Sequence, residues 1–160
     1  MPKKSVIWFL LGVCLAALEA PALPVQAKTL PLVNPKPNDP TDPISCWQWF
    51  DMATTTAGLK RVCSGTYAVD FALPLDYAGT YQVYVTGTIP STNSQLNCQT
   101  IKITPTGGYV FGTNVYLRTV SSQFQYMDLG TVQIDAGDSL FLRCMVRTGA
   151  RILNVDYFPT

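Results

Sequence analysis

Histidine is absent from this 160-residue sequence, and glutamate occurs only once, at Glu19. Histidine is the usual proton carrier near neutral pH and the commonest metal ligand, so Ser-His, Cys-His and His-zinc chemistry are all excluded. Charge is also sparse, because Asp, Glu, Lys and Arg together make up 13% of the residues. We therefore expect a protein that binds a partner and is not an enzyme.

The first 27 residues have the pattern of a secretory signal peptide. Two lysines precede an apolar run, residues 5–17, that is too short to span a bilayer as a stable helix. The tripeptide Val25-Gln26-Ala27 then supplies small or permissive residues before a cleavage point. We expect residues 1–27 to be removed and the protein to be secreted or held at the cell surface. A retained membrane anchor and a lipid attached at Cys14 are the alternatives.

The remaining residues, 28–160, are long enough for one domain with a real core. Five prolines between Thr29 and Ser45 favour an extended chain, so we expect a linker over 28–45 and a domain over 46–160. Nine basic residues balance nine acidic residues after position 27, which gives no steering towards nucleic acid or anionic membranes. No apolar run in this part is long enough to span a membrane.

Four cysteines follow the signal segment: Cys46, Cys63, Cys98 and Cys144. An even set in an exported chain is typical of two disulfides, for which three pairings exist. We favour Cys46–Cys63, which closes a short loop, together with Cys98–Cys144, which joins a strand start to a late strand. The second bond closes the longer loop and is expected to stabilise more. Free buried thiols are the alternative.

Apolar and polar residues alternate with a period of two through most of the second half, which predicts strands. The clearest runs are 67–73, 81–85, 101–103, 115–117, 132–134, 140–146 and 153–157. Turns are predicted at 78–79, 135–138 and 148–149. Short strands broken by Gly and Asp predict an all-β fold, an antiparallel β-sandwich or jelly roll stabilised by disulfides. Only the segment 47–59, where Trp47, Phe50 and Ala53 recur at three-residue spacing, could hold a helical turn.

Three sequence patterns resemble those of galactose-binding-like β-sandwiches, which include the carbohydrate-binding modules of families 6 and 35. The segment AGTYQVYV (78–85) resembles their "aGtY.v.v" strand, and LGTVQIDAGD (129–138) resembles their "v.l.aG.n.l.l" hairpin. The ending ILNVDYF (152–158) resembles their closing "N-i-D-y-f" strand. The resemblance covers residues 66–158 and implies a sandwich that binds a polysaccharide or other glycan through loops at one end.

The resemblance also implies two site residues, whereas a departure from the family pattern leaves a structural calcium unsupported. Phe124 stands where the family often places a loop aromatic, and Asn154 matches the closing-strand Asn. Aromatic rings pack on the apolar faces of sugars, and an amide offers two donors and two acceptor lone pairs to vicinal hydroxyls. Family members usually open with a Glu-rich strand that helps bind a structural calcium. This chain has Cys46-Trp47 and no glutamate there, so we assign no cofactor and leave calcium unsupported.

Three aromatic residues, and also Asn154, have two alternative roles each, whereas Tyr126 has one. Trp47 and Trp49 could form a stacking platform, or a satellite core beneath the Cys46–Cys63 loop. Phe124 is either a ligand contact or part of loop packing. Tyr126 is expected in the core. Asn154 alternates with apolar neighbours, so it points away from the inner face, either towards a ligand or as an outward residue satisfied by backbone.

The charged residues nominate no catalytic or metal site. Asp135 and Asp138 could bind calcium, but Asp preference in turns explains them better. Glycoside hydrolysis needs two carboxyl groups at a definite separation, and the spacing of the aspartates nominates no pair. Arg143 and Arg147 share one face of a strand and could bind acidic sugars, although a solvated edge explains them better.

Two functions remain after these exclusions. The first is a secreted, non-catalytic carbohydrate-binding protein. The second is a structural protein of the cell surface or extracellular matrix that associates with copies of itself, an option favoured by low charge and by Tyr84, Tyr116 and Thr86 on outer faces. Convergence of Trp47, Trp49 and Phe124 in one groove would favour the first function.

Overall fold

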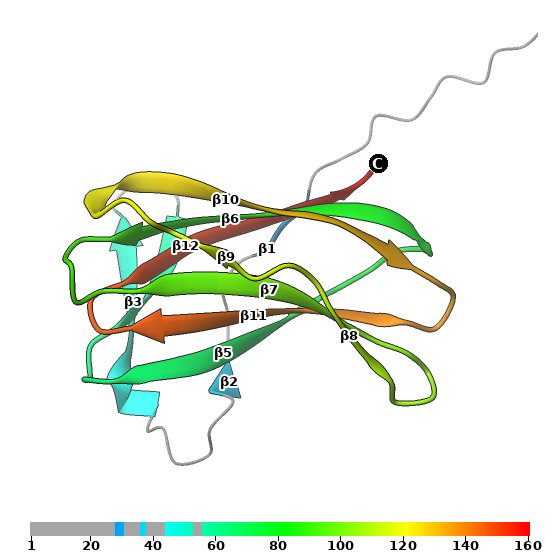
Figure 1. Ribbon diagram of the computed structural model, residues 1–160, viewed down its shortest axis with the longest axis horizontal. Coiled ribbons are helices and arrows are strands. Elements are labelled where there is room, and N and C mark those ends of the chain that lie inside the picture. The colour runs from blue at the N-terminus through cyan, green and yellow to red at the C-terminus, as the bar shows by residue number, and fades with distance from the viewer. Residues whose placement is uncertain (1–27, 31–35, 38–43, 53–55) are drawn as a thin grey trace, which may run out of the picture.

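The computed structural model describes residues 28–30, 36–37, 44–52 and 56–160, and these form an almost purely β structure (Figure 1). One short 3-10 helix, η1, covers Ile44–Cys46. The strands are β1 (Lys28–Leu30), β2 (Lys36–Pro37), β3 (Trp47–Met52), β4 (Thr56–Arg61), β5 (Thr66–Leu73), β6 (Gly79–Ile89), β7 (Leu96–Ile103), β8 (Tyr109–Phe111), β9 (Val115–Tyr116), β10 (Ser121–Ile134), β11 (Ser139–Arg147) and β12 (Arg151–Pro159). Within the described residues, no helix has the length and apolar character that a membrane crossing requires.

The strands form two antiparallel sheets that pack face to face (Figure 1). Sheet A has the order β10-β6-β12-β4-β3, and β1 also pairs with β12. Sheet B has the order β2-β5-β11-β7-β8, and β9 also pairs with β7. The all-β sandwich predicted from the sequence is confirmed.

Alternate residues of the long strands fill the space between the sheets. In β6 the inward residues are Tyr81, Val83 and Val85, none more than 2% exposed. Sheet B supplies Val69 and Phe71 from β5 and further buried residues from β11. Burial of one such face per sheet is the main stabilising contribution in a sandwich of this kind.

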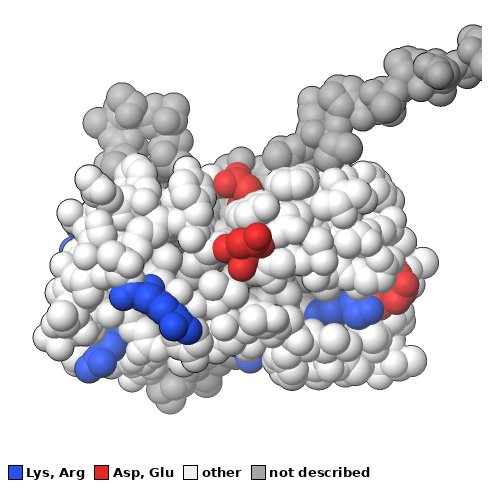
Figure 2. Space-filling view, turned by 45° about the horizontal axis from the view of Figure 1, so that its top comes forward, with Lys and Arg blue, Asp and Glu red and all other residues white. Residues whose placement is uncertain are grey.

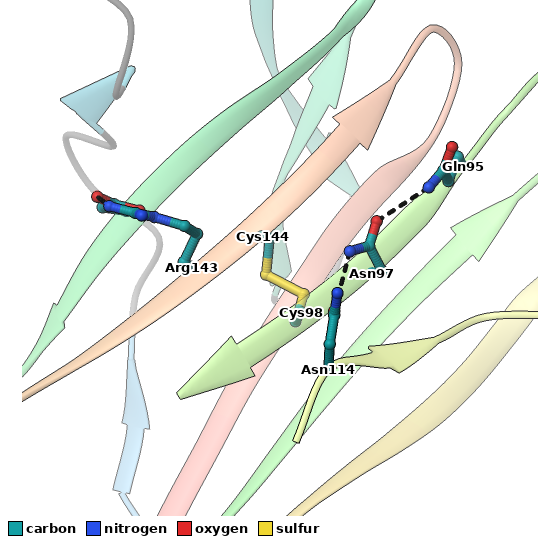
Figure 3. Close-up of a disulfide and its surroundings, with 7 residues drawn as sticks. Gln95, Asn97, Cys98, Asn114, Arg143 and Cys144 are labelled. Carbon is teal, nitrogen blue, oxygen red and sulfur yellow. Dashed lines mark hydrogen bonds and ion pairs between the residues drawn. A yellow bond between two sulfur atoms is a disulfide. The ribbon is translucent and has the colours of Figure 1, made fainter. Parts of the chain in front are cut away.

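Both favoured disulfides are present. Cys46 bonds Cys63, with 4.9 Å between the Cα atoms, and Cys98 bonds Cys144, with 4.1 Å. Cys98 and Cys144 are directly opposite each other on β7 and β11, so this bond lies within sheet B and does not join the two sheets (Figure 3).

The described residues of the segment 47–59, which are 47–52 and 56–59, are strand, so the helical turn predicted there was wrong for them. Strands β3 and β4 form a hairpin in which Trp47 lies opposite Arg61, and β4 continues the sheet by pairing with β12. Pairing with a strand some ninety residues away overrides the local three-residue spacing, as tertiary context often does. Arg61 is 1% exposed, and its guanidinium lies 5.2 Å from the Trp47 ring centroid and 4.0 Å from that of Tyr67.

Parts of the predicted linker belong to the sheets. Residues 28–30 pair with β12 as β1, and Lys36 and Pro37 pair with β5 as β2. A proline is compatible with this position because β2 is an edge strand, where one side needs no hydrogen-bond donor. The rest of 28–45, apart from Ile44 and Ser45, lies outside the described residues, as does the predicted signal segment 1–27.

Candidate functional site

The outer side of sheet A carries a mixed set of aromatic and polar side chains across its strands β10, β6 and β12. We call it the aromatic–amide face. It consists of Phe124, Tyr126, Asp128, Gln82, Tyr84, Thr86, Asn154, Asp156 and Phe158. These residues alternate with the inward residues of the same strands, such as Met127 and Leu129, which are buried in the core. Figure 2 shows that charged side chains are few and scattered on the face that it displays.

Strand register brings residues from distant parts of the sequence into rows across this face. One row runs from Tyr126 through Thr86 to Asn154, and the next runs from Asp128 through Tyr84 to Asp156. Neighbouring residues within a row are about 5 Å apart, because that is the spacing of paired strands. Each row is therefore about the width of one or two sugar rings.

The polar groups of the face are partly engaged with one another. Asn154 Nδ2 donates a hydrogen bond to Asp156 Oδ2 over 2.7 Å, and Gln82 Nε2 donates to Asp128 Oδ1. The Asp128 carboxylate also accepts the backbone N–H of Gly130 over 2.8 Å. These bonds hold both carboxylates in fixed positions.

One polar atom of the face has no partner. Asn154 Oδ1 is buried, and no described residue donates a hydrogen bond to it. A buried acceptor without a donor costs about 1–3 kcal/mol. Asn154 lies where the sequence places it, on the outward side of β12, and the predicted alternative of satisfaction by backbone does not apply to its Oδ1.

Two aromatic rings of the face are open to solvent. Phe124 is 52% exposed and Tyr126 is 76% exposed. The expectation that Tyr126 packs in the core was wrong, because Met127 and Leu129 take the inward positions of β10. That alternation was visible in the sequence and was the signal that could have placed Tyr126 outside. Tyr84 and Phe158, which were not selected as candidates, stack on each other with 5.9 Å between centroids.

Trp47 does not form part of an exposed stacking platform. Trp47 is only 6% exposed and packs with the core under the Cys46–Cys63 bond, which is the second of its two expected roles. Trp49 lies opposite Leu59 in the β3–β4 hairpin, and its side chain is outside those that the structure describes. Trp47 and Phe124 therefore do not converge in a groove.

Loops at one end of the sandwich enclose a small hollow of about 170 Å³. It is lined by the loops 75–78 and 135–138 and contains three aspartates, Asp76, Asp135 and Asp138. Lys102 Nζ lies 3.4 Å from Asp135 Oδ2 and 3.2 Å from Asp138 Oδ2, so an ammonium group already occupies the cation position beside this pair. No described group of three metal-binding side chains has the geometry of a metal site.

The hydrogen bonds and charges at the 135–138 turn shift the pKa values of two groups, Asp138 and Lys102. The backbone N–H of Asp135 donates to Asp138 Oδ2 over 2.9 Å, and this bond, with the nearby Lys102, lowers the pKa of Asp138 below its ordinary value. The hydrogen bond to Asp138 in turn raises the pKa of Lys102. Asp135 and Asp138 therefore act as turn residues, as the sequence favoured.

The outer side of sheet B is different in character. Arg143 donates two hydrogen bonds of 2.8 Å to the Asp70 carboxylate, and this pairing raises the pKa of the guanidinium. Strand β11, which carries Arg143, lies in the middle of sheet B, so the expected solvated edge was wrong. On the other side of the disulfide, Gln95, Asn97 and Asn114 form a chain of amide hydrogen bonds that holds the β9 segment to β7 (Figure 3).

Comparison with known proteins bears on the fold. No known protein family and no curated protein matches the sequence. Among solved structures, the C-terminal family 6 carbohydrate-binding module of a laminarinase from Zobellia galactanivorans superposes with a TM-score of 0.54 at 9% identity, covering 83% of this chain and 99% of that one. The chain has the galactose-binding-like β-sandwich fold.

Two larger enzymes contain the same fold. A mannanase from Podospora anserina with a family 35 module matches with a TM-score of 0.53 at 12% identity, over 84% of this chain and 28% of that one. A xylanase from Clostridium thermocellum with a family 22 module matches with a TM-score of 0.53 at 10% identity, over 71% of this chain and 24% of that one. This galactose-binding-like chain thus spans about a quarter of each of those proteins.

Proposed function

We propose that this protein is a secreted, non-catalytic carbohydrate-binding β-sandwich that binds glycans on its aromatic–amide face. The observation that carries the proposal is that the exposed rings of Phe124 and Tyr126 lie on the same side of sheet A as the amide of Asn154, with Tyr126 and Asn154 in one row. The shared fold with modules named as carbohydrate-binding supports it.

The chemistry of the face suits a sugar. The C–H face of a pyranose packs on an exposed aromatic ring, and its hydroxyl groups can donate to acceptors beside that ring. The exposed Asp128 lies on the same face as those rings and presents a carboxylate to such hydroxyl groups. The family resemblance implied a site in loops, whereas here Phe124 and Asn154 lie within strands β10 and β12.

We infer binding without catalysis from the way the carboxylates of this face are placed. Glycoside hydrolysis needs one carboxyl group to donate a proton and a second to act as base or nucleophile. Asp128 and Asp156 flank Tyr84 on the same row, and each accepts a hydrogen bond from a side-chain amide, which ties both to neighbouring side chains of the face. We expect glycans to be recovered unchanged, with no reducing ends released after prolonged incubation.

The test is binding to a panel of soluble polysaccharides by affinity electrophoresis, followed by calorimetry on the best ligand. Tyr126→Ala should weaken binding about tenfold, because loss of a stacked ring costs about 1–1.5 kcal/mol. Tyr116→Ala is the matched control, since Tyr116 is 47% exposed but lies on sheet B. Equal loss in both variants, or no retardation by any glycan, would refute the proposal.

The proposal includes secretion, which would remove the first 27 residues. Cleavage after Ala27 would leave Lys28, the first residue of β1, at the new N-terminus, ahead of a linker to residue 45 and the domain 46–160. Two disulfides suit an oxidising compartment outside the cytosol. Mass spectrometry of the exported protein should therefore give Lys28 as the first residue, and a retained residue 1 would contradict this.

A further inference from the structure

Strand β8 is the exposed edge of sheet B. It pairs with β7 on one side, through Ile101 opposite Phe111 and Ile103 opposite Tyr109. The three residues of β8 are exposed to 64%, 51% and 56%. No described residue pairs with its other side, and Figure 1 shows β8 at the rim of the sheet.

Hydrogen bonds on either side of β8 fix the direction of its backbone groups. The N–H of Gly112 donates to Thr100 O and the N–H of Thr104 donates to Gly108 O, each over 2.9 Å. Residues two apart in an antiparallel strand point their backbone groups the same way, so residues 108, 110 and 112 face β7. The N–H and C=O groups of Tyr109 and Phe111 therefore face outward.

The edge strand β8 is short, at three residues, but it carries no charge that would oppose strand pairing. Residues 103–117 contain no Lys, Arg, Asp or Glu. Natural edge strands are commonly protected by charges, prolines, bulges or a covering segment. Within β8 there is no proline or charge, and the rings of Tyr109 and Phe111 stack on its outer face with 6.3 Å between centroids.

We propose that β8 is an interface for a second copy of this chain, which pairs β8 with β8 antiparallel around a two-fold axis at Val110. In this register Tyr109 of one copy lies opposite Phe111 of the other. Those are the two residues whose backbone groups face outward, so all four outward groups of each strand find a partner and four hydrogen bonds form.

The register is favourable for the side chains as well. Each Tyr109 meets a Phe111 across the two strands, and aromatic cross-strand pairs stabilise antiparallel sheets. Like-charge repulsion, which a two-fold interface imposes on any charged patch, is absent because the stretch 103–117 is uncharged. A second copy fits better than a segment of this chain such as 28–45, whose prolines lack donors.

An interface formed by one three-residue strand from each copy is small, so we expect a weak, reversible dimer. Interfaces that bury less than about 1,200 Å² in total are typical of transient complexes. Sedimentation velocity from roughly 10 µM to roughly 1 mM should show a monomer that becomes a dimer with rising concentration, since weak interfaces have dissociation constants in this range. A protein that stays monomeric throughout would overturn the proposal.

Charge placed on the edge should abolish the dimer. Phe111→Lys should raise the dissociation constant more than about tenfold, because two ammonium groups would then lie beside the two-fold axis. Tyr109→Lys should act in the same way and guards against a folding defect in the first variant. Val120→Lys is the matched control, since Val120 is 47% exposed and lies outside β8. Dimerisation of both edge variants would place the interface elsewhere and refute the proposal.

The register has its own test. The two Val110 residues would occupy a non-hydrogen-bonded position, where Cα atoms are about 4.5 Å apart and a disulfide can form. Val110→Cys should therefore give a covalent dimer under mild oxidation. Thr106→Cys, in the same hairpin, should not, because four residues from the axis place its two copies more than about 20 Å apart. The opposite pattern would rule out the two-fold at Val110.

Discussion

The outer faces of the two sheets expose different groups. On sheet A, the exposed rings of Phe124 and Tyr126 stand beside amide and carboxylate groups that hydrogen-bond one another. On sheet B, the charges of Arg143 and Asp70 are matched to each other and the exposed edge is apolar. A face of exposed rings and polar groups suits a hydroxyl-rich ligand, whereas a face with an open backbone edge suits another strand.

The sheets also differ in what holds them together. Sheet B contains the Cys98–Cys144 bond between two neighbouring strands, while no disulfide lies within β10, β6 and β12 of sheet A. Strand β6 of sheet A instead packs closely at Gly87, against the backbone of β12 and against Leu96 of β7. Four changes would break or sharpen this contrast.

The largest effect is expected from removal of the sheet B disulfide. Replacing Cys98 and Cys144 by Ala should lower the free energy of unfolding by about 4 kcal/mol, because the bond closes the longer loop, whose ends are 46 residues apart. The same replacement of Cys46 and Cys63, 17 residues apart, should cost about 3 kcal/mol. Guanidinium chloride unfolding measures both. A larger loss of stability for the shorter loop would show that strain or packing, not loop closure, decides which disulfide stabilises the protein more.

Gly87→Ala tests the close packing of sheet A. A Cβ there would lie 2.3 Å from Leu96 Cδ2 and 2.7 Å from the backbone oxygen of Arg151, so β6 and β12 would have to move apart. We expect a loss of about 1–3 kcal/mol in the free energy of unfolding. Gly112→Ala is the sheet B counterpart, where the nearest atom is the Thr100 hydroxyl, which can rotate. A smaller loss for Gly87→Ala than for Gly112→Ala would contradict this.

The Arg143–Asp70 pair tests whether the charges of sheet B stabilise it. A double-mutant cycle with Arg143→Met and Asp70→Asn should give a coupling energy of about 1 kcal/mol, since the contact is bidentate but the side chains are 30% and 25% exposed. Urea unfolding of the four proteins gives this value. Glycan affinity should stay unchanged in all four, and a parallel fall in affinity would link the two faces.

The smallest effect concerns the 135–138 turn. The lowered pKa of Asp138 contributes stability above its ordinary value of 3.8, and this contribution is lost as pH falls through the lower folded-state value. The raised pKa of Lys102 contributes stability that is complete below 10.5 and is lost at still higher pH. Asp138→Asn should make Tm change less with pH at both the acidic and the alkaline end of the pH range. A dependence of Tm on pH as steep as that of the wild type would show that other groups cause it.

Period-two alternation located most of the long strands. Runs such as 81–85 and 140–146 keep their inward residues in the core, and the turn at 135–138 forms as expected. The pairing of strands was not available from alternation, because it depends on contacts between distant segments. Asn154 and Tyr126 share a row only because β6 lies between β12 and β10.

The candidate site could be predicted only in part, for the same reason. Phe124 and Asn154 were proposed as ligand contacts through a family resemblance, and both lie on the outer side of sheet A, while their role in binding stays a prediction. Trp47 is of a residue type that suits a stacking platform. In the structure, however, it lies in the interior beside Arg61, its neighbour across the hairpin. Tyr84 and Phe158 each follow an ordinary strand pattern, so their stacking becomes visible only when the strands are paired.

The central place of β12 in sheet A has a consequence for synthesis. This strand follows every other described strand in the sequence, yet it separates β6 from β4 and also binds β1. Until residues 151–159 emerge, those three strands have no partner on that side, and their edges are open to proteases and to other chains. A protein truncated before Arg151 should therefore be degraded soon after synthesis, whereas all described strands of sheet B precede the truncation.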